Sequence, residues 1–285
     1  MRIPAVQAKR VLVTGCSSGI GAATARLLAA SGWRVFATAR KEEDLAALRA
    51  AGMEPVRLEL ADGDSVRAAA ETVLAACGAE GLGAVVHNAG FCQAGAVEDL
   101  TREALRGQFE ANFFGMHELT RALLPQFRRQ GWGRIVVVSS VFGRMAVPMV
   151  GAYCASKFAL EAWCDSLRVE LAGSGVWVAK IEPGAILSRF RKNAAEALAA
   201  NVAAEESRHG EIYRREVARR RRQVKKRDFF TRPPEEAAAA IWHALESARP
   251  KRRYPVTPSA NLVDLAVRFV PRALIDRVLE KRVPQ

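Results

Sequence analysis

Short apolar runs alternate with longer segments of helical period over the first 180 residues. The apolar runs predict strands buried on both faces, at residues 10–14, 33–38, 55–60, 83–87, 134–139 and 176–181. The segments between them predict helices at 21–31, 42–51, 62–77, 101–129 and 153–172. Gly32 and Gly52 end the first two helices, and Asp62 or Asp64 can cap the third. This alternation predicts an α/β fold with one parallel sheet between two layers of helices.

The pattern changes after Pro183. An alanine-rich segment at 193–204 precedes a basic stretch of helical period at 205–227, and Pro233-Pro234 opens a helix at 235–247. A last strand is predicted at 252–256. Residues 261–282 mix apolar and basic side chains with a helical period, which Pro271 would break into two parts. No internal repeat or low-complexity linker precedes residue 190, so we expect a single domain.

Composition fits this picture. The chain has 285 residues, of which 50% are hydrophobic and 26% charged, so a disordered chain is excluded. The net charge of +13 is uneven, because residues 1–190 contribute +3 and residues 191–285 contribute +10. The five cysteines are scattered and form no Cys-x-x-Cys pair, so neither a disulfide framework nor a metal site is indicated. No signal peptide or membrane-spanning run is visible, and we expect a soluble intracellular protein.

A glycine-rich turn follows the first predicted strand, with the sequence Thr14-Gly15-Cys16-Ser17-Ser18-Gly19-Ile20-Gly21. Glycines let the backbone turn sharply and approach a phosphate, and the helix that begins here directs free N–H groups at it. This position is also the ligand crevice of an open α/β sheet. The turn therefore predicts a dinucleotide site, with a tight turn that binds no ligand as the alternative.

The second predicted strand ends in Ala37-Thr38-Ala39-Arg40. In dinucleotide-binding folds an acidic residue at this point takes the ribose 2′-hydroxyl, whereas an arginine accommodates a 2′-phosphate. Ala39 offers no acceptor, and Arg40 offers a planar cationic fork. This favours NADP(H) over NAD(H), and the alternative is an arginine that only faces solvent.

Tyr153 and Lys157 lie four residues apart on one face of a predicted helix, and Ser140 ends the fifth strand. An ammonium group near a phenol lowers the tyrosine pKa, so that the tyrosine can exchange a proton with an alcohol or a ketone. The hydroxyl of Ser140 can donate a hydrogen bond to the oxygen on which charge develops. A Tyr-x-x-x-Lys pair alone is common by chance, and the alternative is an amphipathic helix with a surface lysine.

Together these motifs make the chain resemble the short-chain dehydrogenase/reductase family, most clearly over residues 8–190. The matching features are the TGxxxGxG turn at 14–21, Asn88-Ala89-Gly90, Asn112, Ser140, Tyr153 with Lys157, and Pro183-Gly184. The turn and the run at 36–40 resemble most the steroid- and retinol-dehydrogenase-like branch and related bacterial aldehyde reductases. The resemblance implies a Rossmann-type doubly wound parallel sheet and an NADP(H)-dependent oxidoreductase.

The resemblance also implies a role for each matched residue. Tyr153 would donate or accept the proton, Ser140 would orient the substrate oxygen, and Lys157 would lower the tyrosine pKa and hold the nicotinamide ribose. Asn112 would anchor a water between Lys157 and solvent. The other cofactor-binding residues would be Gly15, Ser17, Ser18, Gly19, Ile20, Gly21 and Arg40 at the phosphates, Asn88, Ala89 and Gly90 beside the adenosine, and Pro183, Gly184, Ile186 and Ser188 beside the nicotinamide.

Three positions depart from the usual family pattern. His87 replaces the first asparagine of Asn-Asn-Ala-Gly, and we interpret it as a core residue that makes hydrogen bonds. Glu59-Leu60 stands where many members have Asp-Val beside the adenine, so the contact of Glu59 is left open. Ser188 replaces a threonine conservatively. No catalytic group is lost, and we predict an active enzyme.

The segment between Ser140 and Tyr153, with Phe91 and Cys92, predicts a mostly apolar pocket wall. Such a wall favours a bulky lipophilic aldehyde, ketone or secondary alcohol as substrate, and NADPH would favour reduction. The resemblance implies a mobile lid at about 188–230 and a homodimer or tetramer built on the helices that carry Asn112 and Tyr153. We expect a domain at 1–255, which includes the basic lid, and an amphipathic basic extension at 256–285.

The positive charge of the last third has three interpretations. Residues 208–227 contain ten Lys or Arg, and such a run most often forms a solvated helix face. Contact with a membrane surface comes second, because residues 261–282 have the composition of an interfacial amphipathic helix. Nucleic-acid binding comes third, since no nucleic-acid module is recognised. We expect a cytoplasmic protein and leave open a peripheral contact with the inner face of a membrane.

One alternative from another functional class stays open. The chain could be a cofactor-binding regulatory protein or a membrane-associated scaffold that acts through its basic C-terminal third. The complete set of Asn112, Ser140, Tyr153 and Lys157 argues against it.

Overall fold

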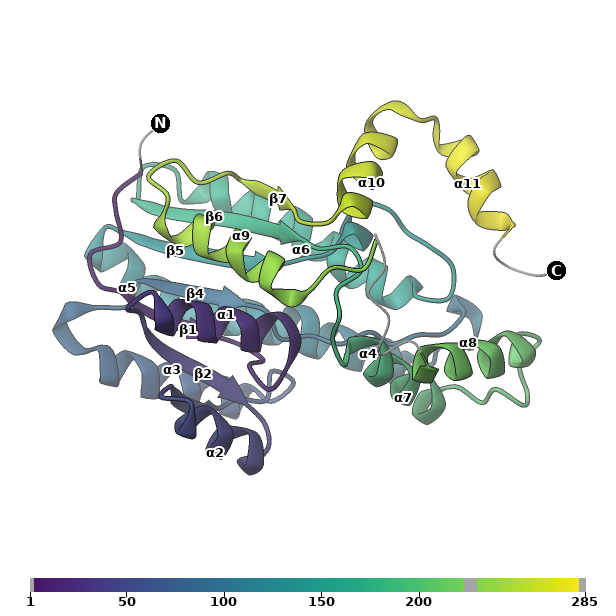
Figure 1. Ribbon diagram of the computed structural model, residues 1–285, viewed down its shortest axis with the longest axis horizontal. Coiled ribbons are helices and arrows are strands. Elements are labelled where there is room, and N and C mark those ends of the chain that lie inside the picture. The colour runs from purple at the N-terminus through teal and green to yellow at the C-terminus, as the bar shows by residue number, and fades with distance from the viewer. Residues whose placement is uncertain (1–2, 223–229, 282–285) are drawn as a thin grey trace.

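The computed structural model describes residues 3–222 and 230–281, which form one seven-stranded sheet between two layers of helices (Figure 1). All neighbouring strands are parallel, in the order β3-β2-β1-β4-β5-β6-β7. The strands are β1 Arg10–Val13, β2 Arg34–Ala39, β3 Glu54–Arg57, β4 Ala84–His87, β5 Gly133–Val138, β6 Val176–Glu182 and β7 Arg253–Pro255. The predicted Rossmann-type doubly wound parallel sheet is confirmed.

Each face of the sheet packs on its own hydrophobic core. The helices on one face are α3 Gly63–Cys77, α5 Gly115–Gln130 and α6 Gly151–Glu170, and those on the other are α1 Gly19–Ala30, α2 Glu42–Ala50 and α9 Pro234–Glu246. Successive residues of β1 alternate between the cores: Leu12 belongs to the first, and Val11 and Val13 to the second. Because both faces are covered, the strand is apolar at every one of these positions.

The long helical region predicted at 101–129 is confirmed, but it is not one uniform helix. This region consists of α4 Arg102–Phe109, a π-helical segment η3 Glu110–Phe114 and then α5. The start of α5 passes close to the backbone of the segment after β3, since a Cβ on Gly115 would lie 1.9 Å from the carbonyl oxygen of Leu60. The chain stays helical through this segment, so the sequence pattern predicted a helical region without showing where its π-turn lies.

Several boundaries in the last third differ from the predicted ones. Helix α7 Phe190–Asn201 begins earlier than expected, and α8 Gly210–Arg222 begins later because turns and irregular backbone occupy residues 202–209. The end of the predicted basic helix, at 223–227, lies outside the described residues. The C-terminal segment forms α10 Pro258–Phe269 and α11 Arg272–Glu280, and the break falls at Pro271 as predicted.

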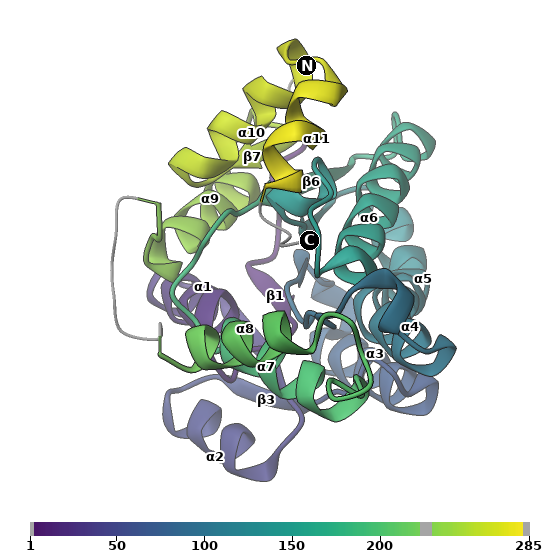
Figure 2. The same ribbon diagram turned by 90° about the vertical axis from the view of Figure 1, so that its right-hand side faces the viewer.

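The carboxyl ends of the strands meet at one end of the molecule. The strand order reverses between β1 and β4, and ligands of such sheets bind outside the strand ends at this point. Figure 2 looks onto this end, with α10 and α11 above the strand ends and α7 and α8 below them. These four helices therefore border the expected ligand position.

The turn after β1 lies in backbone contact with the loop after β4. Gly15 has a φ of +73°, and a Cβ on it would approach the Cα of Ala89 to 2.9 Å. A Cβ on Gly21 would lie 2.1 Å from the carbonyl oxygen of Gly15 and 2.5 Å from Nδ2 of Asn88. The contact therefore requires glycine at both positions, for steric reasons that act before any ligand is considered.

We expect Gly21→Ala to lower the free energy of unfolding by about 1–3 kcal/mol, because its methyl group overlaps backbone atoms of the turn. Chemical denaturation followed by circular dichroism measures this. Gly107→Ala is the matched control, since Gly107 lies within α4 and a Cβ there meets no atom within 4 Å. Equal unfolding free energies for wild type and Gly21→Ala would contradict the steric role of Gly21.

Candidate active site

The N-terminus of α1 has the features of an anion site. Ser18 is the N-cap in an extended conformation, its side chain does not cap the helix, and no acidic residue occupies the first turn. The first amide groups and the helix dipole are therefore directed at any anion that lies beyond the N-terminus. Ser188 lies across the turn, since a Cβ on Gly19 would be 2.9 Å from the Cβ of Ser188. This glycine-lined cradle fits the phosphates of a dinucleotide.

Thr14, which the sequence analysis did not assign to the site, holds this cradle together. Its Oγ1 accepts hydrogen bonds from the backbone N–H groups of Asn88 and Ala89, both at 2.9 Å. Nδ2 of Asn88 donates in return to the carbonyl oxygens of Thr14 and Gly15, at 2.9 and 3.1 Å. The side chain of Asn88 thus binds the turn itself. A threonine directly before the first glycine was the available signal.

Arg40 lies at the end of β2, where the sequence analysis placed it. Its side chain is 72% exposed, and Nη1 lies 3.3 Å from Oε2 of Glu59. Glu59 also accepts a hydrogen bond from the backbone N–H of Ala61 at 3.2 Å. In this structure the Glu59 carboxylate pairs with the Arg40 guanidinium, and its contact with an adenine stays an open question.

A second cation, Arg189, reaches the cradle from the other side. It follows Ser188 at the start of α7, and its Nη2 donates a hydrogen bond to the carbonyl oxygen of Ser17 at 3.0 Å. The sequence shows an arginine next to Ser188 but not its contact with Ser17, because that contact depends on the path of residues 183–190. The segment after β6 therefore lies over the turn after β1.

Tyr153 and Ser140 come together from two elements. Tyr153 lies in the first turn of α6, and Ser140 is the N-cap of the short helix η4 Val141–Gly143 that follows β5. The phenol is only 6% exposed, and the side chain of Ser140 acts on it. Burial raises the pKa of Tyr153, and Ser140 opposes this only in part. The sequence analysis expected Lys157 to lower this pKa, and in this structure the burial of the phenol outweighs any such effect. At neutral pH Tyr153 is therefore a protonated phenol, which suits a proton donor.

Lys157 lies one turn further along α6 and is equally buried. Its Nζ donates to the carbonyl oxygen of Val138 at 2.8 Å and lies 5.7 Å from the centroid of the Tyr153 ring. Burial lowers the pKa of Lys157 to about 8, so the ammonium form is present at neutral pH. The structure therefore brings together Ser140, Tyr153 and Lys157, as the motif spacing predicted.

Asn112 lies in the π-helical segment η3 and connects two parts of the site. Its Oδ1 accepts from the N–H of Phe91 and its Nδ2 donates to the carbonyl oxygen of Phe91, both at 3.0 Å. The same Nδ2 donates to Oγ of Ser156 at 3.2 Å, and Ser156 donates to the carbonyl oxygen of Tyr153 at 2.8 Å. Asn112 thus fixes the loop after Gly90 against α6. Ser156 is a further residue that the sequence analysis missed.

The segment after β6 packs against the start of the C-terminal extension. The N–H of Gly184 donates to Oγ1 of Thr257 at 3.1 Å, and a Cβ on Gly184 would lie 2.2 Å from Oγ of Ser259. Pro183 is buried beside it, and Ile186 forms a bridge with Arg232. The residues expected beside the nicotinamide are therefore held by a part of the chain that carries no family motif.

Apolar side chains surround the phenol of Tyr153. The rings of Phe142 and Phe190 lie with their centroids 6.4 and 5.4 Å from the Tyr153 ring, and both meet it edge-on. Tyr153 belongs to a core cluster that also contains Cys92 from the loop after β4, Val150 before α6 and Leu198 of α7. Residues of the predicted apolar wall therefore pack around the phenol, and their contact with a substrate stays a prediction.

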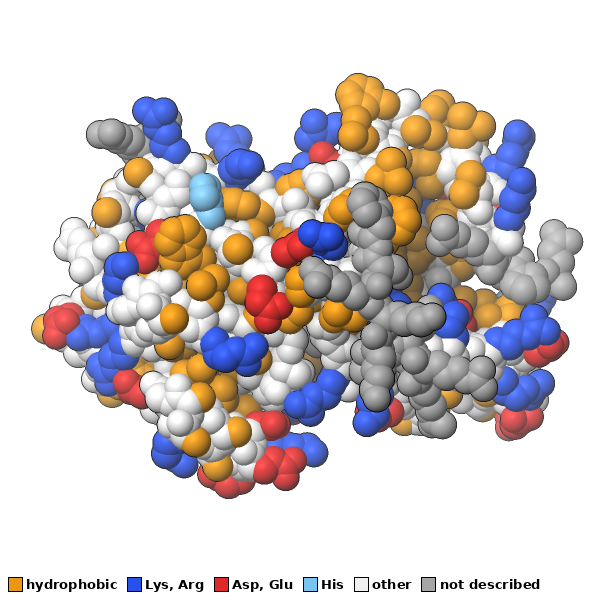
Figure 3. All heavy atoms as spheres, viewed as in Figure 1, with side chains coloured by type: hydrophobic (Ala, Val, Ile, Leu, Met, Phe, Trp, Pro, Cys, Tyr) orange, Lys and Arg blue, Asp and Glu red, His pale blue; other side chains and the backbone are white. Residues whose placement is uncertain are grey.

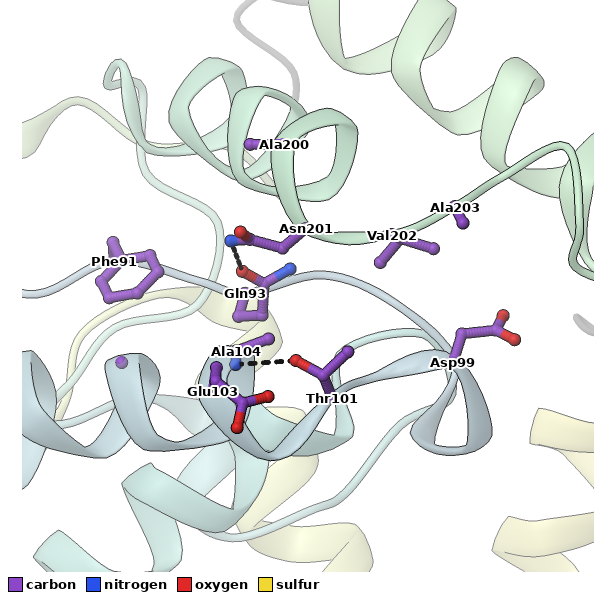
Figure 4. A pocket seen from close by; sticks show the side chains of 11 residues that line it. Phe91, Gln93, Asp99, Thr101, Glu103, Ala104, Ala200, Asn201, Val202 and Ala203 are labelled. Carbon is purple, nitrogen blue, oxygen red and sulfur yellow. Dashed lines mark hydrogen bonds between the residues drawn. The ribbon is translucent and has the colours of Figure 1, made fainter.

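A separate pocket of about 720 Å³ opens between α4 and the end of α7 (Figure 4). Phe91 lies at one end of it and Asp99 at the other, and Nδ2 of Asn201 donates to Oε1 of Gln93 at 2.7 Å. Tyr153 does not line this pocket. It adjoins the site through Phe91, whose backbone Asn112 holds, and through Val202, which belongs to the same core cluster as Tyr153.

His87 lies at the end of β4, beneath the site. It is buried, and its Nε2 is 2.9 Å from Oγ1 of Thr120. Burial lowers its pKa to about 3, so the ring is neutral at physiological pH. This agrees with the interpretation of His87 as a core residue that makes hydrogen bonds.

Within residues 3–222 and 230–281, no group of three or more His, Cys, Asp or Glu side chains could hold a metal ion. All five cysteines fall within these ranges, and they are buried and form no disulfide. None of the described helices combines the length and the apolar character that crossing a membrane requires.

Comparison with known proteins agrees with the geometry. The family model for short chain dehydrogenases matches residues 9–199. An oxidoreductase of Escherichia coli, YbbO, is 40% identical over 275 residues, which cover 96% of this chain and 95% of that protein. Human retinol dehydrogenase 16 is 34% identical, with 95% and 87% covered. The crystal structure of a short-chain dehydrogenase from Streptomyces avermitilis superimposes with a TM-score of 0.77 at 34% identity, covering 95% and 96% of the two chains.

Similar proteins differ in their dinucleotide. The NADPH-dependent 3-dehydrocapnine reductase of Ornithobacterium rhinotracheale is 32% identical over 95% of both proteins. A short-chain dehydrogenase/reductase from Burkholderia phymatum, solved in complex with NAD, is 25% identical with a TM-score of 0.78, covering 93% and 94% of the chains. The dinucleotide cradle, the Ser140–Tyr153–Lys157 cluster and these similarities lead to one conclusion. The chain belongs to the short-chain dehydrogenase/reductase family, whose oxidoreductases use a nicotinamide cofactor.

Proposed function

We propose that the protein is an NADP(H)-dependent oxidoreductase that acts on a lipophilic aldehyde, ketone or secondary alcohol. The observation that carries this proposal is the buried phenol of Tyr153, on which Ser140 acts and whose ring centroid lies 5.7 Å from Nζ of Lys157. The phenol lies among apolar side chains, while the dinucleotide cradle lies at the end of β1 in the same sheet. A regulatory or scaffold protein would have no need of this acid–base cluster.

Tyr153 acts as the general acid in the reductive direction. Its Oη gives a proton to the substrate oxygen, and Ser140 donates a hydrogen bond to the same oxygen. The ammonium of Lys157 favours the phenolate that remains. When bound, the nicotinamide supplies the hydride. Burial keeps Tyr153 protonated at neutral pH, and this supports reduction as the favoured direction.

The residues that hold the cofactor are those placed around the cradle and the segment after β6. They are Gly15, Ser17, Ser18, Gly19, Ile20, Gly21 and Arg40 for the phosphates, Asn88, Ala89 and Gly90 for the adenosine side, and Pro183, Gly184, Ile186, Ser188, Tyr153 and Lys157 for the nicotinamide side. We add Arg189, because its guanidinium already contacts the carbonyl oxygen of Ser17. Asn112 positions the loop and supports the proposed water relay to Lys157.

The preference for NADP(H) is supported by Arg40. Its exposed guanidinium lies at the end of β2, where the ribose 2′-position of a bound dinucleotide is expected, and Ala39 offers no carboxylate to a 2′-hydroxyl. The ion pair with Glu59 is long and largely exposed, so a phosphate can replace it at small cost. The NADPH dependence of the Ornithobacterium reductase supports the same choice.

Lipophilic substrates are supported by the wall around Tyr153 and by the similarity to retinol dehydrogenase 16. Segments α7 and α8 form the part of the proposed lid, residues 188–230, that the structure describes. Tyr213 of α8 hydrogen-bonds to Asp99, and Ser207 donates to the same carboxylate at 2.6 Å. The lid is therefore fastened to the loop that precedes α4, on the side of the site opposite the C-terminal extension.

The C-terminal extension supports a peripheral contact with a membrane. Leu262, Leu265 and Phe269 of α10 are 63%, 56% and 76% exposed and recur at helical spacing, while Asp264 faces inward to Arg253. This orientation reverses that of an ordinary surface helix. Hydrophobic side chains gather over α10 and α11 in Figure 3, with Lys and Arg at the edge. We propose a cytoplasmic homo-oligomer whose extension touches an anionic membrane surface.

Tyr153→Phe is expected to lower kcat for carbonyl reduction by at least about 10²-fold, because the proton donor is removed. NADPH binding, measured by fluorescence titration, should change little. Tyr254→Phe is the matched control, since Tyr254 is also buried but lies in β7 away from the cluster. Turnover of Tyr153→Phe at the wild-type rate would disprove the acid–base role.

Arg40→Asp is expected to weaken NADPH binding by about tenfold or more, because a charge-assisted hydrogen bond is replaced by repulsion of the 2′-phosphate. NADH binding should be unchanged or tighter. Isothermal titration with both nucleotides measures this, and Arg49→Asp on the exposed end of α2 serves as control. A wild-type enzyme that binds NADH more tightly than NADPH would refute the assignment.

The wild-type protein is expected to co-sediment with vesicles that contain phosphatidylglycerol, and Leu265→Ser with Phe269→Ser should lose at least half of this binding. Truncation is less suitable, because Thr257 and Ser259 support Gly184. Val97→Ser, at an exposed site before α4, is the control. Negligible binding of the wild type, or equal binding of both proteins, would remove the membrane contact from the proposal.

A further inference from the structure

A buried ion pair lies one helical turn beyond Lys157. Glu161 follows Lys157 on the same face of α6 and is 6% exposed, and Lys180 of β6 is 2% exposed. Nζ of Lys180 lies 2.8 Å from Oε2 of Glu161 and 2.9 Å from Oδ2 of Asp165, which is half exposed. Two charges of opposite sign are thus enclosed behind the proposed active site, which is costly unless they stabilise each other.

The side chain of Glu161 also touches the turn that carries Ser140. A Cβ on Gly143 would lie 2.9 Å from Cγ of Glu161, 2.9 Å from Oγ of Ser139 and 3.1 Å from the carbonyl oxygen of Lys157. The short helix η4, whose Phe142 N–H donates to Oγ of Ser140 at 3.1 Å, therefore rests on Glu161.

Among the described residues, the titratable neighbours of Lys157 on its own helix are Tyr153 one turn before it and Glu161 one turn after it, on the same face of α6. The carbonyl oxygen of Val138 in β5 accepts a hydrogen bond from its Nζ. Glu161 and the buried thiol of Cys164 act to raise the pKa of Lys157. On β6, Lys180 is bound to Glu161, and Glu182 is paired with Arg253 at 2.6 Å. Glu161 is therefore the carboxylate that helix spacing places nearest to the Lys157 ammonium.

We propose that the buried Glu161–Lys180 ion pair is a positioning element of the reaction site, which fixes the Ser140 turn and keeps Lys157 cationic. This inference rests on the proposed function, because it assigns a task to Lys157. Lys180 in turn keeps Glu161 ionised, since burial alone would favour the neutral carboxylic acid. Neither residue touches the substrate or the cofactor, so both act through Lys157 and the turn.

The ion pair acts on the pKa values of Lys157 and Glu161. Burial lowers the pKa of Lys157 to about 8, and the carboxylate of Glu161 works against this fall. Burial raises the pKa of Glu161, and the neighbouring Glu182 adds to this, while Lys180 lowers it. Removal of the Glu161 charge therefore makes the ammonium of Lys157 less stable. The alkaline limb of the reduction, which reports loss of that proton, moves to lower pH.

The test compares Glu161→Gln, which keeps the shape and removes the charge, with Glu161→Asp, which keeps the charge. Glu170→Gln at the exposed end of α6 is the matched acid-to-amide control. The pKa of Lys157 is measured by NMR on protein with labelled lysines, with Lys157→Arg for assignment. The pH profile of kcat/KM for NADPH-dependent reduction is measured in parallel.

We expect the pKa of Lys157 and the alkaline limb to fall together by about one unit in Glu161→Gln. Neither should move in Glu170→Gln, and in Glu161→Asp, which keeps the charge, both should stay close to their wild-type values. A Lys157 pKa that stays unchanged in Glu161→Gln overturns the inference, even if the variant is less stable. If the Lys157 pKa falls in Glu161→Gln but the wild-type protein reduces no carbonyl compound, the proposed function is overturned. The electrostatic role of the ion pair then remains supported.

Discussion

The backbone contact between the turn after β1 and the loop after β4 is the constraint on which the rest of the site depends. Gly15 and Gly21 leave no room for side chains there, and Thr14 and Asn88 join the two segments by hydrogen bonds. The contact places the N-terminus of α1 at the point where the sheet order reverses. The free amide groups and the dipole of α1 can bind an anion here without a charged side chain.

Hydrogen bonds continue from this contact to the acid–base cluster. The loop after β4 leads to Phe91, whose backbone is held on both sides by Asn112. Asn112 in turn reaches Ser156 of α6, and Ser156 binds the carbonyl oxygen of Tyr153. Asn112 is the buried residue of the π-helical segment η3. The phosphate cradle and the phenol are therefore parts of one connected framework.

Burial determines the chemistry at the other end of this framework. It raises the pKa of Tyr153 and lowers that of Lys157. A neutral phenol therefore lies beside an ammonium group that loses its proton more readily than an exposed lysine. Glu161, Lys180, Glu182 and Arg253 form balanced pairs behind them. The large positive charge of the chain lies mainly in its last third, and of that part only Arg253 belongs to the pairs named here.

The sequence by itself determined the parallel sheet and the main residues of the site, because continuous apolar strands and fixed motif spacings reflect local geometry. It did not reveal the π-helical segment, Thr14, Ser156 or Arg189, since their contacts join segments far apart in the chain. Tertiary structure alone decided that Glu59 pairs with Arg40, that Thr257 supports Gly184 and that Glu161 meets Lys180. These pairings follow from the path of the backbone between strands, which a linear pattern does not record.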